Sequence, residues 1–279
     1  LLNCPVQPIY MCSTSFANVP FIIPFPWVSA LKEMASHSAS RYLKKLPVAG
    51  FLPAKVILTP STSNRHLAME LARYAKTNRA ILIFANTRAT KSFNPLRLGG
   101  FAETLISVSH VPVVLLNSKA ICSTKISSVL FPTDFSVESK RALTLLKPIV
   151  KNLGAKIFVF NQTPFFRISK EDLIQYLPGE IAQYEKLKKT VINERLYSAE
   201  LFMKHLKKGN IESVYVTENQ NKPVQEQAVD FARKNKVNLI ALTTSGGPLS
   251  QAILGGISRD VILQAPCPVL VMNNKNNKK

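Results

Sequence analysis

The stretch LGGFA occupies residues 98–102 and is followed by the apolar run VPVVL at residues 111–115. The related stretch LGGIS occupies residues 254–258 and is followed by CPVLV at residues 267–271. Both members of the second pair lie 156 residues after their counterparts. A pattern that returns at a fixed offset indicates two copies of one structural unit. The sequence therefore predicts two domains of the same fold.

Short apolar runs precede both glycine pairs, at residues 80–85 and 239–243, and are typical of buried parallel strands. A further strand, at residues 55–59 and 211–217, comes before each run, and a segment with helical spacing of apolar residues lies between them. Alternating strands and helices favour a parallel sheet with helices on both faces. We therefore predict an α/β fold: two doubly wound parallel-sheet domains, each an α/β sandwich, in tandem.

The two repeats differ at their beginnings. We expect a first domain at residues 1–118 and a second at residues 119–279, which ends in a short basic tail. The second repeat opens with strand 126–131, helix 137–153, strand 156–161 and helix 183–207. In the first repeat, residues 1–3 look like the tail of a helix that enters a strand at residues 6–12. The first domain is thus predicted to lack its opening strand and helix.

The composition limits the environment and the chemistry of the protein. No run approaches the roughly 18–20 uninterrupted apolar residues of a membrane helix, and residues 19–31, with three prolines, are predicted to form an ordered loop. The four cysteines show no pairing at metal-ligand spacing, which favours reduced thiols and no metal site. We expect a cytoplasmic protein that does not contact membranes.

A formal net charge of +20, from 36 Lys and Arg against 16 Asp and Glu, would attract polyanions. The basic residues are spread over several clusters, and no nucleic-acid-binding signature with interleaved aromatic residues is present. Nucleic acid is therefore not the expected partner. Binding to nucleic acid or to an anionic surface through charge alone is kept as an alternative function.

Three motifs stand out in the second repeat: FPTDFS at residues 131–136, a glycine-bearing loop between residues 243 and 256, and APCPVLV at residues 265–271. Together they resemble the universal stress protein (UspA-like) family of the adenine nucleotide alpha hydrolase-like superfamily. The resemblance covers residues 125–272 and, more loosely, residues 6–116. It implies a Rossmann-like fold, a noncatalytic role in the stress response and, in one branch of the family, binding of ATP.

In that branch an Asp that closes the first strand faces the adenine, and a loop of the form Gly-xx-Gly-x9-Gly-Ser/Thr wraps the phosphates with backbone amides. Asp134 occupies the position of this Asp, where ligands of open α/β sheets bind. The alternative is that Asp134 caps the following helix, although Ser136 is better placed to do so.

The glycine loop departs from the family pattern in three ways. Thr243 stands where the first Gly belongs, eight rather than nine residues separate Gly246 from Gly255, and Gly256 stands where Ser or Thr should follow. A Thr side chain adds bulk where phosphate must approach the backbone. The resemblance thus implies weak or altered binding of ATP or another adenine nucleotide, with no metal. The candidate nucleotide-binding residues are Pro132, Thr133, Asp134, Thr243, Thr244, Gly246, Gly255, Gly256 and Ile257.

No catalytic residues are predicted. The four histidines are dispersed, with no carboxylate and nucleophile arranged around them. Related nucleotide-binding folds include enzymes that cleave ATP, so a nucleotide-hydrolysing enzyme is a second alternative. In the first repeat, Arg88, Lys91 and Arg97 could hold a phosphate or simply solvate a surface loop, and we assign that repeat no competent site.

The last strand of each repeat, at residues 113–117 and 269–273, ends its sheet and exposes an unpaired edge. In the family such strands often pair between subunits. We predict that the two strands pair within this chain and make an intramolecular pseudo-dimer of the two repeats. A homodimer is the other assembly that such edges permit.

Overall fold

The structure is a computed structural model, which describes residues 4–14, 25–45, 51–87, 98–162, 174–175, 178–218, 222–244 and 256–273. The elements of the first repeat are β1 (Ile9–Ser13), α1 (Phe25–Lys44), β2 (Lys55–Thr59), α2 (Asn64–Thr77), β3 (Ile83–Asn86), α3 (Gly100–Val108) and β4 (Val113–Leu116). The elements of the second repeat are β5 (Ser128–Pro132), α4 (Val137–Leu153), β6 (Lys156–Gln162), the 3-10 turn η1 (Pro178–Glu180), α6 (Ile181–Lys207), β7 (Ser213–Glu218), α7 (Val224–Lys234), β8 (Leu239–Thr243), α8 (Gly256–Gln264) and β9 (Val269–Met272). None of the described helices is long and apolar enough to cross a bilayer.

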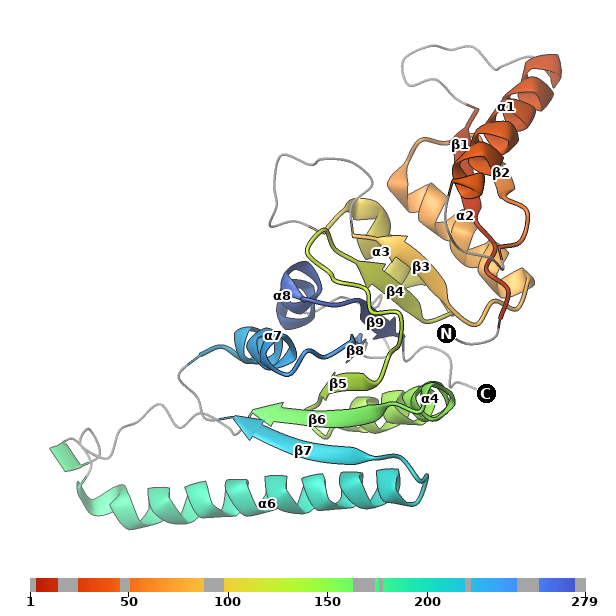
Figure 1. The fold of residues 1–279 in the computed structure, drawn as a ribbon. Helices are drawn as coiled ribbons and strands as arrows, with labels where there is room; N and C mark the ends of the chain where they lie inside the picture. The colour runs from red at the N-terminus through yellow and green to blue at the C-terminus, as the bar shows by residue number, and fades with distance from the viewer. Residues whose placement is uncertain are drawn as a thin grey trace.

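The second repeat forms five parallel strands in the order β9-β8-β5-β6-β7. The chain runs from β5 through β6 to β7 on one side, then crosses to β8 and β9 on the other (Figure 1). One apolar cluster lies between the sheet and α7 and α8, and a second lies between the sheet and α4 and α6. Because both faces are covered, the strands read as continuous apolar runs. The predicted doubly wound α/β fold is confirmed.

Helix α4 shows how local sequence fixes the geometry after β5. Ser136 is its N-cap, and the Ser136 hydroxyl accepts a hydrogen bond from the backbone amide of Ser139 at 3.2 Å. Gly154 ends the helix in the left-handed conformation with φ of 59°, which costs glycine little. The chain then enters β6 at Lys156.

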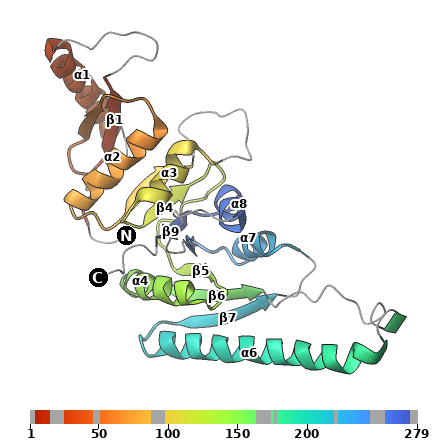
Figure 2. The same ribbon diagram turned by 180° about the vertical axis from the view of Figure 1, so that it is seen from behind.

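The two repeats join through their last strands. β4 pairs antiparallel with β9, with Val113 opposite Val271 and Leu115 opposite Val269. The pairing makes one seven-stranded sheet in the order β3-β4-β9-β8-β5-β6-β7, which is seen from both sides in Figures 1 and 2. The prediction that the final strands pair within the chain is confirmed.

Reciprocal side-chain contacts extend this junction. Asn117, which follows β4, donates to the carbonyl oxygens of Ile262 and Ala265 at 2.9 Å each. Asn273, which follows β9, donates to the carbonyl oxygens of Ile106 and Ser109 at 3.2 and 3.3 Å. The Asn residue after each last strand thus holds the end of the last helix of the opposite repeat.

An ion pair follows the same symmetry. Arg259 of α8 pairs with Glu103 of α3, and these residues occupy equivalent positions because they are 156 residues apart. Side chains at matching places in the two repeats therefore carry opposite charge. The junction has an approximate twofold relation, but it is not symmetric in charge.

The first repeat has two separate pairs of strands where the second repeat has one continuous sheet. β1 pairs in parallel with β2 in a separate two-stranded sheet, whereas β3 is the outer strand of the seven-stranded sheet. In the second repeat, β6 is the counterpart of β1 and β8 is the counterpart of β3, and β5 lies between them. Within the described residues the first repeat thus has the predicted form, without an opening strand and helix, and the helix tail predicted at residues 1–3 lies outside them.

The loop predicted at residues 19–31 is wrong from Phe25 onward, because α1 begins there. Pro26 lies in the first turn of α1, where its missing amide hydrogen has no partner in the helix in any case. The side chain of Trp27 is 68% exposed, so it does not pack into a loop core. Residues 19–24 lie outside the described residues.

Candidate functional site

The candidate site lies where the strand order reverses, at the carboxyl ends of β5 and β8. These strands are neighbours in the sheet, with Val129 opposite Leu239. The chain leaves β5 toward β6 and reaches β8 only after β7, so the loops after β5 and β8 diverge to opposite faces. Such a switch point leaves a crevice in which open α/β sheets bind ligands. Thr133 and Asp134 follow β5, and Thr244 follows β8.

Asp134 stabilises the turn that leads into α4. Its Oδ1 accepts hydrogen bonds from the backbone amide of Ser136 at 2.9 Å and from the hydroxyl of Ser139 at 2.8 Å. Phe135, between them, has a positive φ of 62°. Partial burial disfavours the charged carboxylate, but the hydrogen bonds from Ser136 and Ser139 outweigh it and lower the pKa of Asp134. Asp134 therefore supports the helix start, while Ser136 is the N-cap.

Thr133 connects the end of β5 to β6. Its hydroxyl accepts from the amide of Phe135 at 3.0 Å, and its carbonyl accepts from the Asn161 side-chain amide at 2.6 Å. Asn161 is 5% exposed, and its Oδ1 has no hydrogen-bond partner among the described residues. Sequence reasoning did not identify Asn161 as a site residue, because a polar residue directly after the apolar run of β6 resembles an ordinary strand end.

A cation also reaches this crevice from a distant helix. Arg195 of α6 donates from Nη1 to the carbonyl oxygen of Asp134 at 2.6 Å. The guanidinium therefore lies beside the turn that carries the candidate ligand residue. Sequence reasoning missed Arg195, because a single basic residue in a long helix with many Lys and Arg carries no local signal.

On the β8 side, the described candidate residues differ in exposure. Thr244 is 1% exposed; its amide donates to the carbonyl of Met272 at 3.1 Å, so it continues the pairing with β9. Gly256 begins α8, and the side chain of Ile257 in its first turn is 56% exposed. Gly246 and Gly255 lie outside the described residues. The strand and the helix that flank the glycine loop are thus in place at the switch point.

The first repeat has a strand end equivalent to that of β8, but it has no described strand equivalent to β5. The amide of Thr87 donates to the carbonyl of Leu116 at 2.9 Å, which mirrors Thr244 and Met272. The position equivalent to Asp134 is missing, because no strand lies between β1 and β3 in the described structure. Arg88, Lys91 and Arg97 lie outside the described residues. Within the described part of the chain, no three His, Cys, Asp or Glu side chains are grouped so that they could hold a metal ion.

Comparison with known proteins agrees with this architecture. A model of the universal stress protein family matches residues 125–273, which is more than half of the chain. The chain belongs to the universal stress protein family. The sequence-based resemblance is thereby confirmed, and the match covers the repeat that carries the candidate site.

Solved structures resemble this universal stress protein over both repeats. A universal stress protein from Archaeoglobus fulgidus is 18% identical, with a TM-score of 0.62 over 96% of this chain and 86% of that protein. A protein of unknown function from Pseudomonas aeruginosa is 11% identical, with a TM-score of 0.58 over 96% of this chain and 92% of the other. At these identities the likeness shows the fold alone. A search of curated protein sequences finds no match.

Proposed function

We propose that this universal stress protein is a noncatalytic, cytoplasmic stress-response protein whose second repeat binds an adenine nucleotide weakly. ATP is the proposed ligand. The observation that carries the proposal is the position of the Asp134 carboxylate, kept ionised by its hydrogen bonds, at the switch point between β5 and β8. The proposed binding residues are Pro132, Thr133, Asp134, Thr243, Thr244, Gly246, Gly255, Gly256 and Ile257.

The adenine end of the ligand is assigned to the loop after β5. Both hydrogen bonds to the Asp134 side chain end on Oδ1, so Oδ2 is the proposed acceptor for the adenine amino group. Arg195 is held beside Asp134, and we propose that its guanidinium stacks on the base.

The phosphate end is assigned to the start of α8. The first backbone amides of a helix have no partner within the helix and favour an anion. Helix α8 begins at Gly256, directly after the glycine loop. The buried Thr244 fixes the end of β8 through its bond to Met272, so we assign it a positioning role.

Weak binding without catalysis follows from what the loop contains. Thr243 stands where the ATP-binding pattern has a glycine, and the spacing between Gly246 and Gly255 is one residue shorter, so we propose weaker binding of phosphate than in that pattern. Phosphoryl transfer also requires a positioned nucleophile and groups that neutralise developing charge. Asp134 is the single acidic candidate and is occupied with the start of α4.

Calorimetric titration of ATP into the full chain tests the proposal. We expect saturable binding with a dissociation constant of about 0.1–1 mM, equivalent to about 4 to 5.5 kcal/mol. Asp134→Asn preserves the acceptor for Ser136 and Ser139 but removes the charge, and it should weaken binding about tenfold. Thr144→Ala, on the exposed side of the same helix α4, is the control and should leave affinity unchanged. An absence of binding at millimolar ATP would contradict the proposed nucleotide-binding function.

A second titration separates base recognition from charge. With a net charge of +20, the protein could retain any polyphosphate nonspecifically. Inorganic tripolyphosphate should therefore be compared with ATP at physiological ionic strength. Equal affinity for both, with a steep loss as salt rises, would favour the charge-driven alternative over an adenine site.

A further inference from the structure

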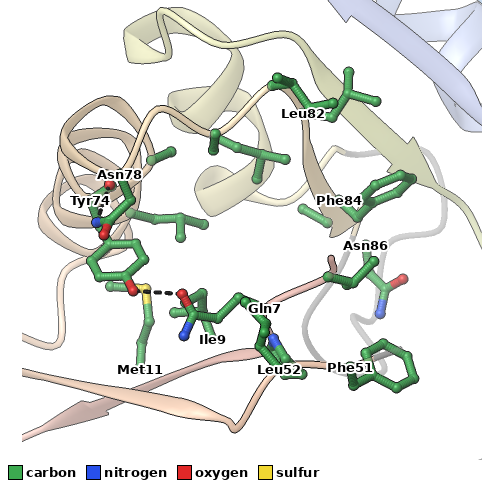
Figure 3. A pocket seen from close by; sticks show the side chains of 18 of the residues that line it. Gln7, Ile9, Met11, Phe51, Leu52, Tyr74, Asn78, Leu82, Phe84 and Asn86 are labelled. Atoms are coloured by element: carbon green, nitrogen blue, oxygen red, sulfur yellow. Dashed lines mark hydrogen bonds between the residues drawn. The ribbon is translucent and has the colours of Figure 1, made fainter. Parts of the chain in front are cut away.

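An open cavity of about 1060 Å³ lies inside the first repeat, between β1 and β3. In Figure 3, Gln7, Ile9 and Met11 line one side, and Leu82, Phe84 and Asn86 of the β3 segment line the other. Helix α2 closes one face, where the Tyr74 hydroxyl donates to Oε1 of Gln7 at 2.8 Å. The cavity therefore separates two strands that are held in place by the same helix.

Both strands present an unpaired edge to the cavity. Among the described residues, β1 pairs with β2 alone and β3 pairs with β4 alone. The amides of Ile83 and Thr87 donate to carbonyls of the β4 side, at 3.0 and 2.9 Å. Because amides alternate in direction along a strand, those of Phe84 and Asn86 point away from β4, toward the cavity. Exposed strand edges of this kind are templates for another strand.

The second repeat shows what occupies the equivalent place. There β5 pairs with both β6 and β8, and its residues are buried on both faces of the sheet. The amide of Ile240 bonds to Pro268 as that of Ile83 bonds to Pro112, so Phe84 is the counterpart of Ala241. Ala241 is fully buried, whereas Phe84 is 54% exposed.

No described helix covers the exposed side of Phe84. Ala241 belongs to the apolar cluster that α4 and α6 cover, and Leu82 packs against the margin of that cluster. Phe84 points to this same face, because it alternates with Ile83, which packs under α2 and α3. One strand would thus fill the space between the edges, and one helix would cover Phe84.

We infer that this cavity is the seat of a β-strand followed by a helix, of the same form as β5 and α4, in polypeptide that leads into Cys4. A strand parallel to both β1 and β3 needs a crossover connection to reach the next strand. In the second repeat α4 provides this connection and delivers the chain to β6, the counterpart of β1. Polypeptide tethered at Cys4, which itself lines the cavity, therefore fits better than a separate peptide.

The surroundings of the cavity predict which residues the strand that fills it would carry. Its strand carries apolar residues on both faces, because one face meets α2 and α3 and the other meets its own helix. Its carboxyl end would lie beside the carboxyl end of β3, as β5 runs parallel to and beside β8 in the second repeat. An occupied cavity would thus complete a second switch-point crevice in the first repeat.

A fusion tests the seat directly. A copy of residues 125–152 is placed ahead of Leu1 in the full chain, and a matched control carries Asp at the copies of Val129 and Leu130. Hydrogen exchange at the Phe84 and Asn86 amides should slow at least about tenfold in the fusion and not in the control. The Ile83 and Thr87 amides, already bonded to β4, should change less. Equal exchange in fusion and control would overturn the inference.

The source of the strand is tested on the protein isolated from its own cells. Intact-mass analysis should show polypeptide joined upstream of Leu1, and the Cys4 thiol should label at least about tenfold more slowly than in the 279-residue chain. A natural protein that begins at Leu1 would overturn the tethered source. Slow labelling that appears only as protein concentration rises would assign the cavity to a second copy instead.

Discussion

Replacing Asn273 by Ala should destabilise the junction between the two repeats more than any other single polar substitution there. The Asn273 side chain is 5% exposed, and its amide reaches the carbonyls of Ile106 and Ser109 at the end of α3. The substitution removes this donor from the carbonyls of Ile106, Ser107 and Ser109, which lie where water does not reach easily. An unsatisfied buried polar group costs about 1–3 kcal/mol, so we expect a loss of about 2–4 kcal/mol.

Asn117→Ala is the matched control, because Asn117 makes the equivalent bonds to Ile262 and Ala265. Asn117 is only partly buried, so water can replace its amide and the expected loss is about 1 kcal/mol. Urea unfolding followed by circular dichroism gives the free energies of both variants. A loss for Asn273→Ala no larger than that for Asn117→Ala would refute the assignment of the larger cost to burial.

Three further outcomes follow from described residues. Pro148 is exposed and lies inside α4, so Pro148→Ala should restore a helical hydrogen bond and raise the free energy of unfolding by about 1–2 kcal/mol in the same urea assay. Burial raises the pKa of Cys267 to about 12, so an aromatic disulfide reagent should label the exposed Cys122 at least about a hundredfold faster in the native protein. The pKa of Asp134 is lowered below 3.8, so its contribution to stability is complete above that pH and is lost as pH falls through the lowered value. The difference in unfolding free energy between wild type and Asp134→Ala should therefore shrink below about pH 4, whereas a constant difference would contradict this linkage.

Most of the fold was predictable because both faces of the central sheet are covered. Buried parallel strands must be apolar throughout, so β8 and α4 were placed at their observed bounds and β6 was placed to within one residue. The pairing of β4 with β9 was also predictable, since an apolar strand at the end of a sheet needs a partner. These features depend on which residues are buried, and the positions of apolar residues along the sequence indicate burial directly.

The contacts of the candidate site were less predictable, because they depend on distant parts of the chain. Arg195 reaches Asp134 across 61 residues, and only the packing of α6 against α4 brings them together. The start of α1 was missed for a different reason, since a proline in the first helical turn resembles a proline in a loop. Asp134 itself was identified, but its bonds to Ser136 and Ser139 depend on the left-handed turn at Phe135.

The charges at the junction influence which strands can pair with β4 and β9. Glu103 and Arg259 are equivalent residues that face each other across β4 and β9. If two copies of the second repeat paired in this manner, Arg259 would face Arg259, and two copies of the first repeat would bring Glu103 onto Glu103. An exposed ion pair stabilises an interface by only about 0–1 kcal/mol, whereas two like charges in the same place destabilise it. The preference for Glu103 opposite Arg259 is therefore the difference between these two energies. The pairing within one chain therefore occupies both strands, and like charges disfavour pairing of β4 with a second β4 or of β9 with a second β9.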